Sequence, residues 1–214
     1  MEGSRASSGP TGRVRVYVDG FNLYYGLKSK GWRRLYWVDL AALSARLLRG
    51  DQRLVGVRYF TARISGGPPD KRRRQTRFLR ALETLPNLTM HYGHFLQKTR
   101  TCTRCSARWT TYEEKMTDVN VAVQLLGDAQ DDDFDTTFVL SADSDLAGPI
   151  EAVLERYPNR RVIVAFPPGR HSEKLRSVAS GSFTLGRKLM SDCQFPDKVV
   201  RGDGSSVTRP ASWR

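Results

Sequence analysis

The sequence predicts an α/β fold in which a mostly parallel central sheet is covered by helices on both faces. Two observations support this prediction. Short apolar segments rich in β-branched residues alternate along the chain with amphipathic segments of helical period, and no internal repeat interrupts the alternation. The chain of 214 residues is also long enough for one domain of this class with a substantial core. We therefore expect a single α/β domain.

Five segments have the composition of β-strands. The first is RVRVYVD at residues 13–19, where Val14, Val16 and Val18 alternate with other side chains. The others are residues 54–61, 88–95, 136–140 and 161–166. Amphipathic patterns predict helices at residues 38–48, 71–85, 113–129, 147–157 and 173–179. This alternation is typical of parallel strands joined by helical crossovers.

The helix expected at residues 113–129 follows an irregular basic segment. That segment is QKTRTCTRCSARWTT at residues 97–111, and we expect it to be a Cys-containing functional loop or a small substructure. In the helix itself, Glu114 and Asp118 would lie one turn apart. The expected buried stripe consists of Val119, Ala122, Val123 and Leu126.

Both ends of the chain are polar and rich in small residues. Residues 1–12 and 201–214 are therefore expected to be flexible tails around an ordered domain at residues 13–200.

The chain carries 35 Lys and Arg against 22 Asp and Glu, a formal net charge of +13. Such a balance favours a polyanionic partner, and nucleic acid before a membrane. No signal peptide or apolar run of about 18 residues is visible, so we expect a cytoplasmic protein with no membrane partner. Three cysteines do not form a secreted disulfide scaffold.

Carboxylates follow two of the expected strands directly. Asp19 ends the first strand, and Asp143 and Asp145 follow the strand at residues 136–140. Ligands of open α/β sheets bind beyond the carboxyl ends of the strands, so these acids are expected to converge with Asp118. An all-oxygen set suits Mg²⁺ or Mn²⁺ rather than Zn²⁺. Helix capping is the alternative explanation, especially for Asp145.

Asn22 follows Asp19 by three residues. Its side chain would either cap the next helix or face a metal-bound water or a phosphate, and the sequence leaves both interpretations open.

Several basic and aromatic residues are candidates for RNA contacts. Lys115 and Arg170 are expected near the carboxylates, where they would reach a phosphate. Segment 28–37 mixes bases with aromatic residues, which suits either stacking on single-stranded bases or a packed lid. The candidate nucleic-acid-binding residues are Lys115, Arg170, Lys28, Trp32, Arg33, Arg73 and Arg77.

Cys102 and Cys105 form half of a zinc knuckle. Zn²⁺ bound by this pair together with His91 or His94 is one interpretation, and a pair of cysteines without metal is the favoured one.

Three motifs together resemble the NYN domain family, in the LabA-like branch of the PIN-like nucleases. They are VYVDGFNLYYGL at 16–27, EEKMTDVNVAVQLL at 113–126 and FVLSADSDLAGPIEAV at 138–153. The resemblance implies a PIN-like three-layer α/β/α sandwich and a divalent-metal ribonuclease activity. Its acidic site falls on Asp19, Asp118, Asp143 and Asp145, with Asn22 as the polar partner.

The sequence departs from the family pattern at two places. Ala142 stands where glycine is common, and Gly181–Ser182 stand where relatives often carry a further Asp. We expect a metal-dependent endoribonuclease that uses Mg²⁺ or Mn²⁺ on single-stranded or structured RNA. The alternative is a non-catalytic RNA-binding module of the same fold. The sequence leaves open whether the protein is a monomer or a homodimer.

Overall fold

The computed structural model of the chain describes residues 12–66 and 68–214, so the expected tail at residues 1–12 lies almost wholly outside the described residues. Seven strands form one sheet in the order β4-β3-β2-β1-β5-β6-β7. All neighbours in it are parallel except β3 and β4. The predicted α/β class with a mostly parallel sheet is therefore confirmed. The strands are β1 (Arg13–Asp19), β2 (Arg53–Ala62), β3 (Leu88–Thr101), β4 (Arg108–Lys115), β5 (Thr136–Leu140), β6 (Arg161–Phe166) and β7 (Gly181–Thr184).

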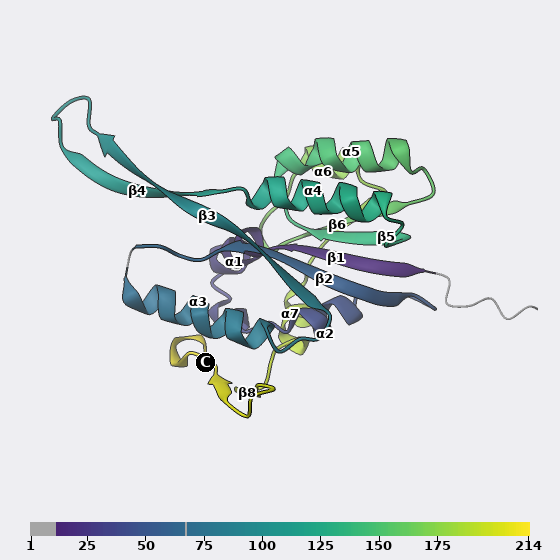
Figure 1. The fold of residues 1–214 in the computed structure, drawn as a ribbon, viewed down its shortest axis with the longest axis horizontal. Helices are drawn as coiled ribbons and strands as arrows, with labels where there is room; N and C mark the ends of the chain where they lie inside the picture. The colour runs from purple at the N-terminus through teal and green to yellow at the C-terminus, as the bar shows by residue number, and fades with distance from the viewer. Residues whose placement is uncertain (1–11, 67) are drawn as a thin grey trace, which may run out of the picture.

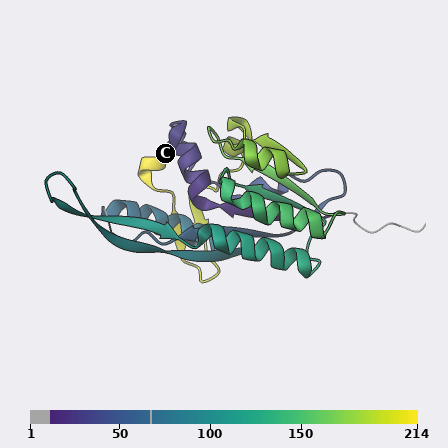
Figure 2. The same ribbon diagram turned by 90° about the horizontal axis from the view of Figure 1, so that it is seen from above.

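Helices cover both faces of this sheet (Figures 1 and 2). One face packs on α1 (Gly20–Ser29), α2 (Leu40–Ala45), α3 (Pro69–Leu82) and α7 (Arg187–Asp192). The other packs on α4 (Thr117–Gln130), α5 (Ala147–Arg156) and α6 (Glu173–Val178). The valines of β1 belong to the first core cluster and Tyr17 to the second, as the period of two in a strand requires. No helix in the described part of the chain is long and apolar enough to cross a bilayer.

The basic segment at residues 97–111 is not a loop. β3 and β4 pair antiparallel from His94 opposite Lys115 to Thr101 opposite Arg108, and this hairpin projects well beyond the body of the molecule (Figure 1). Thr99 lies opposite Thr110 and Arg100 opposite Trp109, and the threonines and tryptophan of the segment favour an extended conformation. The cysteines therefore lie at the tip of a β-hairpin.

The expected helix at residues 113–129 begins too early. Residues 113–115 belong to β4, and Met116 then adopts a left-handed conformation with φ of 78° before α4 starts at Thr117. The expected buried stripe is also wrong, because Val119 and Val123 are 45% and 58% exposed. The buried face carries Val121, Leu125 and Ala129, which are spaced one helical turn apart.

Residues 201–214 do not form a loose tail. β8 (Lys198–Val200) pairs with β9 (Ser206–Thr208), and a short 3₁₀ helix, η3 (Ala211–Trp213), ends the chain. Trp213 is buried against Tyr36, Trp37 and Phe78. Polar composition predicted disorder, but one aromatic side chain anchors the segment to the core.

Candidate active site

The candidate site lies between β1 and β5, where the order in which the chain adds strands to the sheet reverses. From β1 the chain proceeds outward through β2 and β3, then returns to the other side of β1 with β5 and proceeds through β6 and β7. The carboxyl ends of β1 and β5 therefore border the crevice that open α/β sheets use for ligands. Asp19 is the last residue of β1, and Ser141 and Asp143 follow β5 directly.

Asp19 is buried and held by hydrogen bonds on both oxygens. Its Oδ1 accepts from the Asn22 backbone N–H at 2.9 Å, and its Oδ2 accepts from Asn22 Nδ2 at 2.5 Å and from Ser141 Oγ at 3.0 Å. Burial raises the pKa of the Asp19 carboxyl above its ordinary value, the hydrogen bonds from Asn22 and Ser141 oppose that rise, and the nearby charge of Asp143 adds to it. The site therefore orients a carboxylate whose charge a bound cation would stabilise.

The chain turns from β1 into α1 without an intervening loop. Asp19 is the N-cap of α1, and Gly20 is its first residue. A Cβ on Gly20 would meet the Tyr59 hydroxyl and lie 2.8 Å from the Phe60 carbonyl oxygen, so only glycine fits between α1 and β2. This close approach fixes where the Asp19 carboxylate points.

Asn22 connects Asp19 to Arg170. Its side-chain oxygen accepts from Arg170 Nη1 at 2.7 Å, while its Nδ2 donates to Asp19. The structure gives the helix cap to Asp19, whose carboxylate accepts from the Asn22 backbone N–H, so the capping interpretation of Asn22 is wrong. The Asn22 amide instead joins the Asp19 carboxylate to Arg170. Arg170 lies after β6, as the sequence suggested, and is positioned by this contact.

Asp143 is the N-cap of the 3₁₀ helix η2 (Ser144–Leu146), where its Oδ1 accepts from the Asp145 N–H at 3.1 Å. Its own N–H donates to Ser141 Oγ at 3.1 Å. The capping role that the sequence suggested for Asp145 therefore belongs to Asp143. Asp145 is exposed and does not line the pocket described next.

A pocket of about 350 Å³ lies in front of Asp19. Asp143 lines it from the β5 side, and Glu114, Lys115 and Asp118 line it from the junction between β4 and α4. The left-handed Met116 forms part of the same wall. A non-glycine residue in this conformation costs about 1–3 kcal/mol and commonly accompanies functional sites. The pocket thus contains three of the four predicted metal ligands.

Glu114 does not share a helix with Asp118. It lies on β4, and its Oε1 accepts from the N–H and the hydroxyl of Thr117 in the first turn of α4. The start of α4 is therefore fixed by the Glu114 carboxylate from the preceding strand. The neighbouring Lys115 Nζ lies 3.4 Å from Glu113 Oε2.

The donor chemistry of the pocket fits Mg²⁺ or Mn²⁺, although the carboxylates do not form a closed ligand shell. Among residues 12–66 and 68–214, no three His, Cys, Asp or Glu side chains gather closely enough to hold a metal ion by themselves. Mg²⁺ usually binds through one or two carboxylates and retains several waters. Asp19 and Asp143 beside an open pocket suit such a hydrated ion, with Asp118 farther out on an exposed helical turn.

A comparison with known protein families decides which family has this fold and this pocket. Residues 13–186 match the NYN domain. The chain belongs to the NYN family. Proteins of this family are generally nucleases with a PIN-like fold, they typically use divalent metals, and the family implies a nucleic-acid substrate in general.

Two individual proteins are similar to this NYN domain. A Pseudomonas putida protein named 6-hydroxy-3-succinoylpyridine 3-monooxygenase is 25% identical over 94% of this chain and 75% of its own length. A crystal structure of a Vibrio parahaemolyticus protein of unknown function superposes with a TM-score of 0.55 at 19% identity, covering 85% of this chain and 98% of the other. The second similarity concerns the fold alone.

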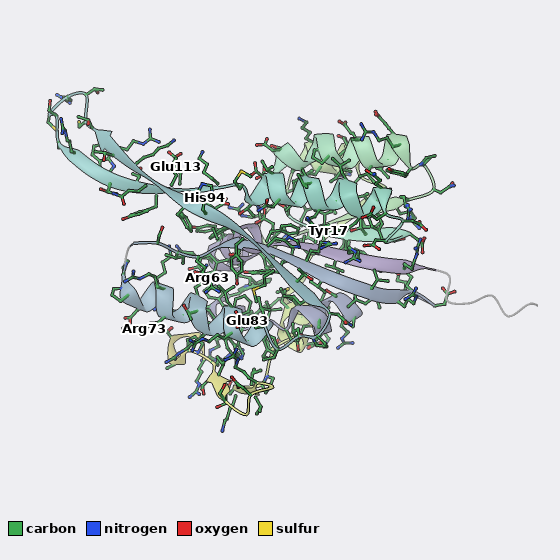
Figure 3. The ribbon with its side chains drawn as sticks, in the orientation of Figure 1. Tyr17, Arg63, Arg73, Glu83, His94 and Glu113 are labelled. Atoms are coloured by element: carbon green, nitrogen blue, oxygen red, sulfur yellow. The ribbon has the colours of Figure 1, made fainter. Side chains whose placement is uncertain are left out.

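The other predicted RNA contacts of the NYN domain lie on α1, on α3 and at the start of the 3₁₀ helix η1 (Arg33–Leu35). The Lys28 Nζ lies 5.7 Å from the ring centroid of Tyr25, on α1. Trp32 is half-buried against the core with Arg187 over its ring, which favours the packed-lid interpretation for this residue. Arg33 is exposed. Arg77 and Arg73 (Figure 3) are exposed on α3. Arg73 pairs with Asp70.

Zn²⁺ bound by the two cysteines together with His91 or His94, which was one of the two interpretations of the sequence, does not fit the structure. His94 lies near the base of the hairpin (Figure 3), and eight residues of extended strand at roughly 3.3 Å each separate it from Cys102 by about 26 Å. His91 is farther still and stacks on Phe60 in the sheet. Cys102 and Cys105 remain at the hairpin tip, where N–H groups of Arg104 and Cys105 lower the pKa of the Cys102 thiol.

Sequence reasoning missed two features of the site. Ser141 holds both Asp19 and the Asp143 backbone, and its place directly before ADSD was the available signal. The second feature is an aromatic cavity on the other side of α1. Tyr24 and Tyr25 in the first motif, and Lys71 and Arg74 one turn apart on α3, were its signals.

Proposed function

We propose that this NYN domain is a metal-dependent endoribonuclease. The observation that carries the proposal is that Asp19 and Asp143, at the ends of the adjacent strands β1 and β5, line the same pocket. Lys115 lines this pocket too, and Arg170 lies beside it through its hydrogen bond to Asn22. Two carboxylates that line one pocket favour binding of a cation there, and nearby basic side chains favour a phosphodiester. The net charge of +13 extends this preference to a long polyanion.

In the proposed reaction, Asp19 and Asp143 would hold one Mg²⁺ or Mn²⁺, and Asp118, which lines the same pocket, would supply a further oxygen donor. Asp145 lies outside the pocket and would contribute only its negative charge. When bound, the ion lowers the pKa of a water and neutralises charge on the phosphate. Asn22 and Ser141 keep the Asp19 carboxylate aimed at the pocket. Lys115 and Arg170 bind non-bridging phosphate oxygens. Attack by the water oxygen on phosphorus breaks the bond to the 3′ oxygen, which takes a proton, leaving a 5′-phosphate and a 3′-hydroxyl.

Cleavage of end-labelled single-stranded and hairpin RNA tests the proposal, with Mg²⁺, Mn²⁺ or EDTA. We expect metal-dependent cleavage by the unchanged chain and a loss of at least about 100-fold in Asp19→Asn and Asp143→Asn, the size found when a group that stabilises transition-state charge is removed. Asp203→Asn, in the exposed turn between β8 and β9, is the matched control and should cleave normally. Equal residual cleavage in all variants would show that these carboxylates are not catalytic.

The alternative is an RNA-binding module without turnover. Salt-sensitive RNA binding with no cleavage under any metal condition would establish that alternative. We do not extend the monooxygenase activity in the name of the Pseudomonas relative to this chain, since the carboxylates and basic side chains of the pocket match phosphodiester chemistry.

A further inference from the structure

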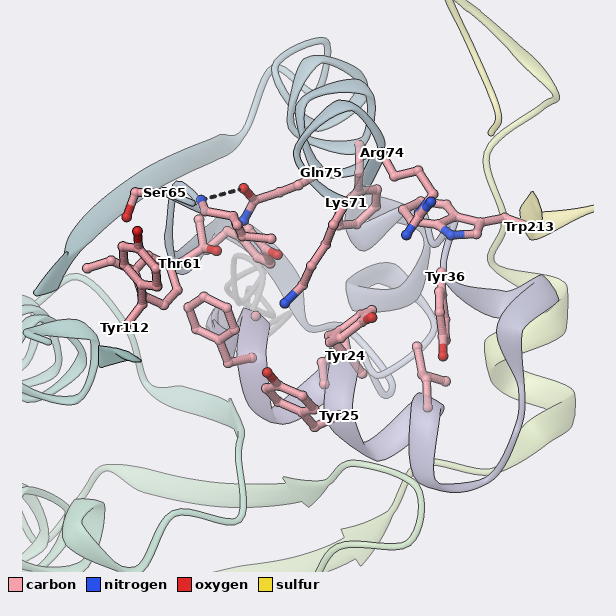
Figure 4. Close-up of a pocket in the computed structure, with 18 of the residues that line it drawn as sticks. Tyr24, Tyr25, Tyr36, Thr61, Ser65, Lys71, Arg74, Gln75, Tyr112 and Trp213 are labelled. Atoms are coloured by element: carbon pink, nitrogen blue, oxygen red, sulfur yellow. Dashed lines mark hydrogen bonds between the residues drawn. The ribbon is translucent and has the colours of Figure 1, made fainter. Parts of the chain in front are cut away.

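An aromatic cavity of about 260 Å³ lies on the other side of α1 from the carboxylate pocket. It is bounded by α1, by α3, by the segment between β2 and α3, and by the C-terminal Trp213 (Figure 4). Phe21 lines both this cavity and the carboxylate pocket, so the two sites share one side chain in their walls. A ligand that occupies both the cavity and the carboxylate pocket would have to pass Phe21, as an extended strand would.

The walls of the cavity are built of rings. Tyr24 and Tyr36 lie 5.1 Å apart by ring centroids, and Tyr36 contacts Trp213 at 5.6 Å. Tyr25 and Tyr112 line the opening and are each about 41% exposed. Walls of this kind accept a flat ring by stacking and edge-to-face contact. The volume lies just below the range of about 300–1,000 Å³ for ligand sites, which limits the occupant to one small ring system.

Two cations from α3 face this aromatic surface. Lys71 extends into the cavity toward Tyr24, and Arg74 extends toward Trp213 (Figure 4). Within the described part of the chain, neither side chain takes part in an ion pair or a side-chain hydrogen bond, whereas Arg73 on the same helix pairs with Asp70. The cavity therefore combines stacking surface with unpaired positive charge.

Hydrogen bonds from α3 hold the rim of the cavity at Ala62 and Ile64. Gln75 accepts from the Ile64 N–H at 2.8 Å and donates to the Ala62 carbonyl oxygen at 2.9 Å, which fixes the segment after β2 against α3 (Figure 4). Because these hydrogen bonds hold Ala62 and Ile64 in place before binding, stacking energy is not spent on ordering this part of the rim.

We propose that this cavity binds one unstacked base of the RNA, belonging to a nucleotide adjacent to the scissile phosphodiester, while Lys71 and Arg74 contact the flanking phosphates. The inference rests on the proposed function, because it places the base relative to the carboxylate pocket. Because Phe21 lines both sites, they are neighbours, which favours a base of a bound strand over a separate small molecule. Tyr25 supports it, since its ring lies between the cavity and the basic groups of Lys28 and Arg170.

The test is a binding experiment in EDTA, where no metal-dependent cleavage occurs. Fluorescently labelled single-stranded oligoribonucleotides, each with one abasic nucleotide moved along the strand, are titrated with the full chain. Because stacking of one base on aromatic side chains contributes about 1–3 kcal/mol, we expect affinity to fall about 5- to 150-fold at one position in the bound register and little elsewhere.

Two variants connect this loss to the cavity. Ser65 is exposed and lines the opening, so Ser65→Trp blocks the cavity without altering the core; Ser177→Trp, on the exposed side of α6, is its matched control. Tyr25→Ala removes an exposed wall. We expect the position-dependent loss to disappear in Ser65→Trp and Tyr25→Ala and to persist in Ser177→Trp.

Equal losses at every abasic position, or a loss that persists in Ser65→Trp, would overturn the proposal. So would displacement of the oligonucleotide by free benzoate but not by nucleoside monophosphates, which would assign the cavity to aromatic acids. A specific position-dependent loss in a chain that cleaves no RNA would support the base site and reject only the nuclease. No binding at low salt would reject both.

Discussion

Gly26 lies in the interior of α1, where glycine normally weakens a helix. A Cβ at this position would lie 2.8 Å from Pro167 Cβ and 2.9 Å from the Pro168 carbonyl oxygen, closer than side-chain carbons pack. Glycine thus allows α1 to approach the segment after β6, and that approach brings Asn22 within hydrogen-bond distance of Arg170. We predict that Gly26→Ala destabilises this contact as well as the fold.

The magnitude follows from a comparison with Gly127, inside α4, where an added Cβ would have nothing within 4 Å among the described residues. Replacing glycine by alanine in a helix interior stabilises by about 0.5–1 kcal/mol, and this gain applies to both positions. Overpacking adds a cost of about 1–3 kcal/mol only at Gly26. Gly127→Ala should therefore stabilise the protein, and Gly26→Ala should be less stable than Gly127→Ala by about 1–3 kcal/mol.

Urea unfolding followed by circular dichroism measures both free energies of unfolding. RNA affinity in EDTA then reports on the Arg170 contact, which we expect to weaken in Gly26→Ala and not in Gly127→Ala. If Gly26→Ala stabilises the protein as much as Gly127→Ala does, the close approach of α1 to Pro167 and Pro168 does not constrain this position, and the reasoning is refuted.

Three further predictions concern the rest of the chain. Buried Asp128 pairs with Arg58 and accepts from Tyr17, so Asp128→Asn should lower the free energy of unfolding by about 3 kcal/mol in urea titrations, while the partly exposed Asp133→Asn should change it by less than about 1 kcal/mol. Trp213→Ala should cost about 3–5 kcal/mol, and an unchanged melting temperature would contradict the buried C-terminal anchor. Lys98, with smaller contributions from Lys115 and Arg100, lowers the pKa of Glu113 to about 2. These cations stabilise only the ionised carboxylate, so pairing of β3 with β4 should weaken as Glu113 is protonated, between about pH 4.5 and pH 2. Amide NMR shifts of the hairpin should show this change in the unchanged chain and not in Glu113→Gln.

The sequence determined the class of the fold and named three of the carboxylates that line the candidate pocket. Alternation of valines in residues 13–19 and the acids that end two apolar runs follow from local periodicity, which a single sequence displays directly. The helical segment at 113–115 was predicted wrongly because its side chains pair with a strand elsewhere in the chain. Such pairing is a long-range contact that local pattern does not contain.

Only the tertiary structure decided which side chains meet. The order of strands set Asp19 beside Ser141 and Asp143, and the packing of α1 set Asn22 against Arg170, 148 residues away. Trp213 joins the aromatic cavity from the far end of the chain for the same reason. Residue type and spacing fix the chemistry that a segment offers, while the distances between segments depend on how the whole sheet and its two helical layers pack.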